Sequence, residues 1–479
     1  MSVARKIAYN TGVQAIGKAG SIVLGLITIG FITRSIGTAG FGAFTTVTAF
    51  LQFFGIAVDL GLTITLASLF GNPNTDRKKI LGTALGFRLV SGLLFFGAAP
   101  IVALFFPYSG EIKIGIAIAA LAFLATAFTQ MLSALFQANL RMDKIAIAEI
   151  ASRAALLLGV IISAYLHGGL LGIFIALVAA NVLNALLALL FANSFTPVRF
   201  SFDTREWMEL LRRSWPVAVS IALNLVYLRA DVLVLSLSRT VEEVGLYGAA
   251  YRVVDVLTAF PVLFMGLILP LLSGAWATGD KEKFARLYQK SFYALVILAL
   301  PLVAGTLALG DKVMSILAGE EFASSGSILR VLILAVFFLF IGALPLHTVV
   351  AIEKQKRILW AFAASAVLSL ALYALLIPRY GVFAAAGITL FSEAFVAVSA
   401  GILVKKETGV GFGIISAWRA ALSAIIMGAA GYFMRDLHAI AAVTLSALIY
   451  FALLLATGAV TPNTLTELLK LRAKKPINP

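Results

Sequence analysis

Long apolar runs constrain this chain more than any other feature. A helix needs about 20 apolar residues to cross the hydrocarbon core of a bilayer. The sequence contains fourteen runs of that length, separated by short polar connections. Open strands cannot satisfy their backbone groups in lipid, so these runs predict an all-α integral membrane protein of about fourteen transmembrane helices. Their ranges are 11–33, 43–70, 80–106, 113–138, 145–166, 170–192, 214–238, 245–275, 288–309, 327–350, 357–377, 382–404, 414–433 and 438–460.

Lysine and arginine are distributed unevenly among the connections. The N-terminal segment and every second connection after it together hold 25 lysine and arginine residues. The connections between them hold 6. Cytoplasmic connections carry the excess, so we predict that both termini are cytoplasmic. This placement also accounts for the net charge of +15 without a nucleic-acid partner. The six residues of the intervening connections are Arg34, Lys113, Arg239, Lys312, Arg379 and Arg435.

The two halves of the chain show a weak internal repeat. The segment Arg34–Gly40 recurs as Arg239–Gly245 at an offset of 205, and Gly169-Leu-Leu-Gly matches Gly381-Val-Phe-Ala at an offset of 212. Six helices in each half is an even number, so the copies are predicted to be parallel repeats. Transporters with this plan rock two bundles about a central cleft.

The repeat predicts five regions. They are an N-terminal six-helix lobe (1–195), a cytoplasmic linker (196–213), a C-terminal six-helix lobe (214–404), two further transmembrane helices (405–460) and a basic cytoplasmic tail (461–479).

Several kinds of chemistry are excluded by what the chain lacks. It has no cysteine, and its three histidines are scattered, so no metal site or cofactor is predicted. The run from Gly12 to Ala19 resembles a P-loop, but Ala19 replaces the Mg²⁺-binding hydroxyl residue and no strand precedes it. No Ser/His/Asp or paired-carboxylate arrangement occurs in the short connections, so we predict a transporter and not an enzyme.

Charged residues inside the predicted helices are the candidate functional residues, because a charge in the bilayer is costly unless it faces protein or water. Cations that line a hydrated cleft would bind a phosphate-bearing substrate. The acidic residues would bind a coupling proton or sodium ion, or pair with the cations. The cationic candidates are Lys18, Arg88, Arg153, Arg229 and Arg252, and the acidic ones are Asp59, Asp231, Asp255 and Glu393.

Pairing within a helix is the alternative explanation for some of these charges. Glu149 and Arg153 are four residues apart, and Arg252 and Asp255 are three apart, so each pair shares a helix face. Arg330 lies near a helix end, where its side chain can reach the interface.

Pairs of glycines four residues apart occur at Gly82/Gly86 and Gly168/Gly172. Their spacing predicts close packing between helices.

Several segments together resemble the polysaccharide or O-antigen flippases of the multidrug/oligosaccharidyl-lipid/polysaccharide (MOP) exporter superfamily. Phe31–Gly42 followed by Asp59-Leu-Gly resembles the first connection and second helix of that family. Asp231-Val-Leu-Val-Leu with Glu243–Tyr251 resembles the start of its second lobe, and Pro378-Arg-Tyr-Gly with Ser392-Glu393 resembles its late helices.

The resemblance implies an alternating-access flippase of the cell (inner) membrane that moves an oligosaccharide linked to undecaprenyl pyrophosphate from the inner to the outer leaflet. It implies partners in the same process, namely membrane lipids, a polysaccharide polymerase and glycosyltransferases. Two other functions stay open: a proton- or sodium-coupled multidrug antiporter of the same superfamily, and a membrane-embedded enzyme or scaffold of polysaccharide synthesis.

Overall fold

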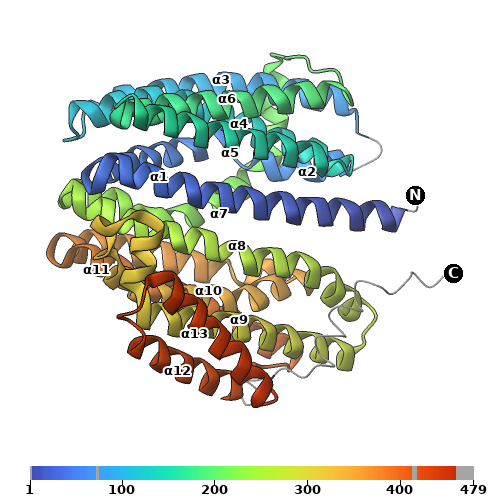
Figure 1. Ribbon diagram of the computed structural model, residues 1–479. Helices are drawn as coiled ribbons and strands as arrows, with labels where there is room; N and C mark the ends of the chain where they lie inside the picture. Colours follow the sequence, from blue (N-terminus) through green and yellow to red (C-terminus); the bar gives the residue numbers. More distant parts are fainter. Residues whose placement is uncertain (1–2, 72–74, 413–417, 460–479) are drawn as a thin grey trace. The chain divides into compact units, whose positions relative to one another are not determined.

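The computed structural model describes residues 3–71, 75–412 and 418–459, and every regular element in these ranges is a helix (Figure 1). The predicted tail at 461–479 lies outside the described residues. The α-helices are α1 (Val3–Asp59), α2 (Leu62–Gly71), α3 (Arg77–Ala103), α4 (Gly110–Ala138), α5 (Met142–Tyr165), α6 (Gly169–Asn193), α7 (Thr204–Ser238), α8 (Val241–Ala277), α9 (Lys281–Ala318), α10 (Ser325–Ala351), α11 (Leu359–Thr408), α12 (Trp418–Phe433) and α13 (Ala439–Ala456), and two short 3₁₀ helices span Glu320–Phe322 and Gln355–Arg357.

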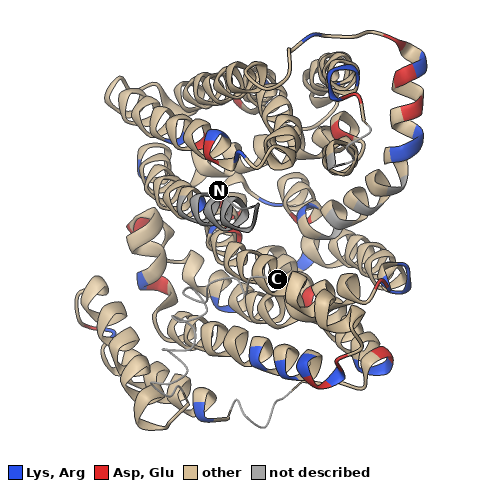
Figure 2. Ribbon diagram, turned by 90° about the vertical axis from the view of Figure 1, so that its right-hand side faces the viewer, with Lys and Arg blue, Asp and Glu red and all other residues tan. Residues whose placement is uncertain are grey.

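Large apolar side chains cover the outside of these helices. Leu94, Leu190 and Ile425 are each more than 60% exposed, which only a lipid environment makes favourable over so large an area. Most of the ribbon is uncharged, and Lys, Arg, Asp and Glu occupy only scattered turns (Figure 2). Ten described helices are long and apolar enough to cross a membrane, and the bent α7 would be an eleventh. The predicted all-α membrane fold is therefore confirmed, while the number fourteen stays a prediction.

Two of the long helices contain a break where the sequence predicts a connection. In α1 the break is at Gly37, with φ 63°, and in α11 it is at Gly381, with φ 59°. Glycine adopts this left-handed region at little cost. Gly381 corresponds in the predicted repeat to Gly169, which has φ 54° at the start of α6. Helix α11 thus covers two of the predicted apolar runs, and α1 covers the first run and part of the second.

The prediction of one helix over 43–70 is wrong. Helix α1 ends at Asp59, Leu60 and Gly61 have φ of 43° and 74°, and α2 begins at Leu62. The run is apolar on both sides of the break, so hydropathy gives no sign of it. Gly61 is required here, because a Cβ on it would lie 2.6 Å from the carbonyl oxygen of Ser214 in α7.

The chain forms two compact units, which are described separately. Unit 1 consists of Met1–Ala249, Leu317–Glu321 and Phe362–Ala385, and unit 2 consists of Ala250–Ile316, Phe322–Ala361 and Ala386–Pro479. The lobes predicted at 1–195 and 214–404 stay a prediction.

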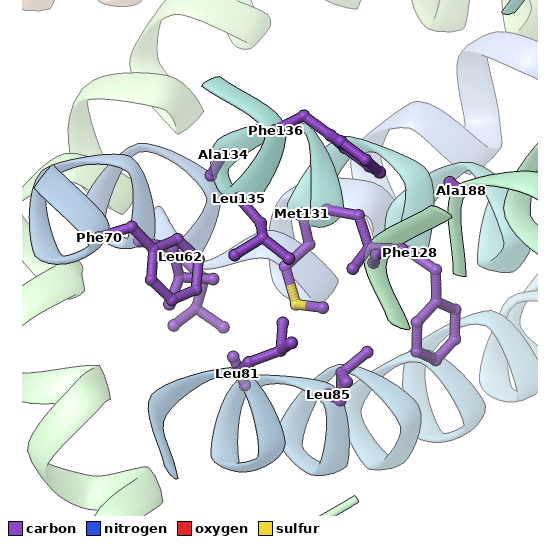
Figure 3. Packing of buried hydrophobic residues seen from close by; sticks show 14 of the residues in the cluster. Leu62, Phe70, Leu81, Leu85, Phe128, Met131, Ala134, Leu135, Phe136 and Ala188 are labelled. Carbon is purple, nitrogen blue, oxygen red and sulfur yellow. The ribbon is translucent and has the colours of Figure 1, made fainter. Parts of the chain in front are cut away.

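The core of unit 1 joins the consecutive helices α2, α3 and α4 and includes residues of α6 and α7. Leu81 and Leu85 of α3 point toward Met131 and Leu135 of α4, and Phe70 of α2 closes one end of the cluster (Figure 3). Helix α4 also packs against α6, and α5 against both α1 and α6. These contacts hold α1, α4, α5 and α6 side by side, which is the arrangement that the candidate site needs.

The glycine pairs pack closely, but one of them does not contact a helix. The extended segment after α6 lies on Gly82 and Gly86: Ser201 N donates to Gly82 O at 2.9 Å, and a Cβ on Gly86 would lie 1.9 Å from Ser201 O. The expectation of a helix partner there is wrong, since an irregular backbone segment occupies the space. Gly172 packs on Ser163 of α5, where its Cβ would lie 2.2 Å from the hydroxyl oxygen.

Connections predicted on the same side of the membrane contact each other within unit 1. On one side, Arg34 Nη1 donates to Leu317 O at 3.4 Å. On the other, Lys79 and Glu206 form an ion pair with 2.7 Å between Nζ and Oε1. These contacts agree with the prediction that successive connections lie on alternate sides of the membrane. Which side is cytoplasmic stays a prediction.

Candidate functional site

A polar cavity of about 380 Å³ lies in unit 1, with walls from α1, α4, α5 and α6. Ten of its fourteen lining residues are polar or charged, in helices that otherwise expose leucine and isoleucine. Its volume is within the range of small-molecule sites, about 300 to 1,000 Å³. The polar lining residues are Lys18, Thr126, Thr129, Gln130, Ser133, Glu149, Ser152, Arg153, Asn181 and Asn184.

Helical periodicity brings these side chains to one face of each helix. In α5, Glu149, Ser152 and Arg153 follow the i, i+3, i+4 spacing that defines one face. The polar residues of α4 and α6 follow the same rule, at 126, 129, 130 and 133 and at 181 and 184. Sequence reasoning that considered only charges missed these hydroxyl and amide groups. Their helical spacing inside apolar runs is the signal that would have found them.

Two cations and one carboxylate set the charge of the cavity. Lys18 of α1 pairs with Glu149 of α5, with 3.5 Å between Nζ and Oε1, and both side chains keep some exposure, 47% and 29%. The spacing on α5 left open a pair between Glu149 and Arg153. Instead its ion pair crosses to α1, and within the described part of the chain Arg153 has no ion-pair partner. The cavity therefore has a net positive charge and one half-buried guanidinium without a carboxylate.

A buried amide oxygen also faces this region without a partner. Among the described residues, Asn184 Oδ1 accepts no hydrogen bond although it is inaccessible to solvent. A buried acceptor of this kind costs about 1 to 3 kcal/mol if it stays unsatisfied. The other hydroxyl and amide side chains that line the cavity have both donors and acceptors for a hydroxylated ligand. The cavity thus combines groups for a phosphate with groups for a hydroxylated molecule.

Arg88 and Asp59 form a buried ion pair at the break between α1 and α2. The distance from Arg88 Nη2 to Asp59 Oδ1 is 2.6 Å, and the Arg88 side chain is 0% exposed. Thr63 donates its hydroxyl to the same carboxylate oxygen, and Ser91 donates to Val58 O at 3.3 Å. Ser91 thus bonds a backbone carbonyl group at the helix break, and Asp59 pairs with one nitrogen of Arg88, while Arg88 Nε and Nη1 are buried without a hydrogen-bond partner among the described residues. Arg88 does not line the polar cavity.

Asp231 is completely buried in α7 and connects this helix to α8. It accepts hydrogen bonds from the hydroxyl group of Tyr247 and from the backbone amide of Val232. Arg229, two residues earlier, is half-buried on the same helix. Asp231 therefore links α7 to the start of α8 through a hydrogen bond. Arg229 is not among the residues that line the polar cavity.

The remaining candidates lie in unit 2. Arg252 and Asp255 pair on one face of α8, with 3.5 Å between Nη1 and Oδ2, so the expected pairing within the helix is present. Glu393 of α11 is only 4% exposed, and its Oε1 has no hydrogen-bond partner among the described residues. The described residues contain no group of three or more His, Cys, Asp or Glu side chains placed to hold a metal ion.

The fold is that of transporters of the MOP superfamily. The structure resembles the lipid II flippase MurJ in an inward closed conformation, with a TM-score of 0.75 and 16% identity over 92% of this chain and 97% of that one. It also resembles an inward-facing multidrug resistance transporter of the MATE family within the MOP superfamily, with a TM-score of 0.65 and 12% identity over 81% of this chain and 94% of that one.

Residues 4–276, more than half of the chain, match the model of the polysaccharide biosynthesis protein family, so the chain belongs to that family. It is also similar to a protein of Shigella flexneri that carries the name O-antigen transporter, with 24% identity over 407 residues, 81% of this chain and 94% of that relative. The resemblance expected from the motifs at Asp59, Asp231 and Glu393 is thereby confirmed at the level of the superfamily.

Proposed function

We propose that this protein is a flippase that carries a lipid-linked oligosaccharide from the inner to the outer leaflet of the cell membrane. The family and the transporter fold support this function. The observation that carries the proposal is the polar cavity of unit 1, where Lys18 and Arg153 accompany a set of hydroxyl and amide side chains. Undecaprenyl pyrophosphate is the proposed carrier, and the polymerase and glycosyltransferases of the same glycan are the proposed partners.

The physical need for such a cavity comes from the head group. An unpaired hydroxyl group costs about 2 to 7 kcal/mol in an apolar medium, so an oligosaccharide cannot cross hydrocarbon bare. Hydroxyl and amide groups on α4 and α6 replace water for the sugar, and the cations on α1 and α5 replace it for the phosphate. The lipid tail stays in the bilayer throughout. Movement through a cleft between two six-helix lobes, with both termini in the cytoplasm, is part of the proposal.

A multidrug antiporter is the second candidate, since the fold is shared with MATE transporters. A site for organic cations needs negative charge, whereas two of the three charged groups that line the cavity are cations. The charge therefore favours an anionic cargo.

Deletion of the gene from its source cell tests the proposed function. Surface polysaccharide should be lost while its lipid-linked precursor accumulates, because synthesis continues without transfer to the outer leaflet. Re-expression of the wild-type chain should restore export. Normal surface polysaccharide together with a new sensitivity to organic cations would instead show the antiporter.

We propose Glu393 as the group that couples transport to a proton or sodium ion. A carboxyl group inside a membrane protein is a default candidate for an ion relay, and Glu393 is buried with one oxygen unpartnered among the described residues. In reconstituted vesicles, an imposed proton or sodium gradient should accelerate transport by the wild type and leave Glu393→Gln unaffected. Glu353→Gln, which changes an exposed carboxylate in the same unit, is the matched control. A gradient response in Glu393→Gln equal to that of the wild type would remove Glu393 from this role.

A further inference from the structure

A second charged cavity, of about 420 Å³, lies entirely within unit 2. It forms where α9 is interrupted at Leu309, with φ −122° and ψ 19°, and where α12 ends. Three cations reach it from three separate elements: Lys312 from α9, Arg330 from α10 and Arg435 from the connection after α12. Two of these, Lys312 and Arg435, belong to the six basic residues of the sparsely charged connections.

One of the three cations is already neutralised by the protein. Arg330 makes a two-pronged ion pair with Asp311, with distances of 3.0 Å and 2.7 Å, and its Nε donates to Leu307 O at 3.1 Å. The helix break supplies that carbonyl group. Arg330 and Asp311 therefore fix the wall of the cavity and contribute almost no net charge to it.

The other two cations are held in place by neutral groups. Lys312 Nζ donates to Leu437 O. The Arg435 guanidinium lies 4.7 Å from the centre of the Tyr432 ring and donates to its hydroxyl oxygen at 3.0 Å. An ammonium donates three hydrogen bonds and a guanidinium five, so each retains donors for a ligand. With Asp436 as the remaining carboxylate, the cavity keeps a net positive charge.

Exposed apolar side chains belong to this cavity (Leu307) or lie next to its lining residues in the sequence (Phe433 after Tyr432, and Leu437 after Asp436). Phe433 is 83% exposed, and Leu307 and Leu437 are each 46% exposed. A soluble anion would gain nothing from these side chains, whereas a lipid would place its acyl chains over them and its phosphate beside the cations. Basic pockets between transmembrane helices bind anionic head groups in this way.

We infer that the cavity formed by Lys312, Arg330 and Arg435 binds the phosphodiester head group of an anionic membrane lipid. The site goes beyond the proposed transport function, because it shares no residue with the polar cavity of unit 1. Its occupancy can be measured without any transport assay.

The test uses the purified full-length chain in detergent, after removal of native lipid. Phosphatidylglycerol, phosphatidylcholine and inorganic phosphate are titrated separately, and binding is followed by native mass spectrometry and by the shift in unfolding temperature. The variant Lys312→Gln with Arg435→Gln removes both charges, and glutamine keeps a donor for Leu437 O. Lys113→Gln is the matched control, since Lys113 also donates to a carbonyl oxygen near a helix end, that of Leu104, but lines no described cavity.

Phosphatidylglycerol should bind the wild type and Lys113→Gln alike, and at least tenfold more weakly to the double variant. Phosphatidylcholine should bind the wild type at least tenfold more weakly than phosphatidylglycerol. Equal binding of phosphatidylglycerol to the double variant would overturn the site. Equal binding of phosphatidylcholine would show that acyl chains alone are recognised, and inorganic phosphate that displaces the lipid at similar concentration would assign the site to a soluble anion; either result would overturn the proposal.

Discussion

Replacing both Lys18 and Arg153 with glutamine will stop export of the polysaccharide while the protein still reaches the membrane. A hydrogen bond to a charged group contributes about 1.5 to 3 kcal/mol, so loss of two such contacts to a pyrophosphate lowers binding by about a hundredfold or more. Both side chains line the cavity and neither is deeply buried, so the fold should tolerate the change. Surface polysaccharide, normalised to the amount of protein in the membrane, is the measurement.

A matched control removes the same charge elsewhere in unit 1. Lys78 is exposed at the start of α3, and Lys144 of α5 contacts the ring of Phe191 without lining the cavity. Lys78→Gln with Lys144→Gln should leave export close to that of the wild type. Normal export by the Lys18/Arg153 variant would mean that this cavity does not bind the cargo.

Breaking the buried pair between Asp59 and Arg88 will have the largest effect on stability. Removing one partner of a buried ion pair costs about 3 to 5 kcal/mol, because the other charge stays buried without compensation. Asp59→Asn and Arg88→Met should each lower the unfolding temperature sharply and reduce the amount of folded protein recovered in detergent. Asp59→Asn with Arg88→Met should recover part of the loss, since neither charge remains.

An exposed pair in the same unit provides the comparison. Arg213 and Glu209 pair on α7 with both side chains more than half exposed, and such pairs contribute at most about 1 kcal/mol. Glu209→Gln should therefore be almost neutral. If the Asp59 and Arg88 variants were equally mild, or if their effects simply added in the double variant, the pair would not hold the helix break.

The sequence predicts the parts of this structure that depend on local pattern. Runs of apolar residues locate the membrane helices, and the connections at Gly37 and Gly381 appear as breaks within α1 and α11. The pairing of Arg252 with Asp255 also follows from spacing within one helix. Each of these features is determined by residues that are close together in the sequence, so it can be predicted without the tertiary fold.

Patterns of neighbouring residues do not predict the contacts between segments that are distant in the sequence. Lys18 and Glu149 meet across 131 residues, and this contact takes Glu149 away from Arg153, four positions along its own helix. At the break after Asp59, the partner of this residue is Arg88 of another helix, and the sequence is apolar on both sides of the break. The helical spacing of the neutral polar side chains of α4 and α6 is visible in the sequence, but only the packing of the helices shows that they line one cavity.

Transfer of a lipid-linked oligosaccharide across a membrane is the central claim, and it can be measured directly. The purified protein is reconstituted in vesicles that carry a fluorescent lipid-linked oligosaccharide, and the fraction accessible to an external quencher is followed with time. Wild-type vesicles should lose the protected inner-leaflet fraction rapidly, whereas vesicles with Lys18→Gln and Arg153→Gln should retain it as protein-free vesicles do. A protected fraction that persists equally with the wild-type protein, under any imposed potential or ion gradient, would contradict the proposed function.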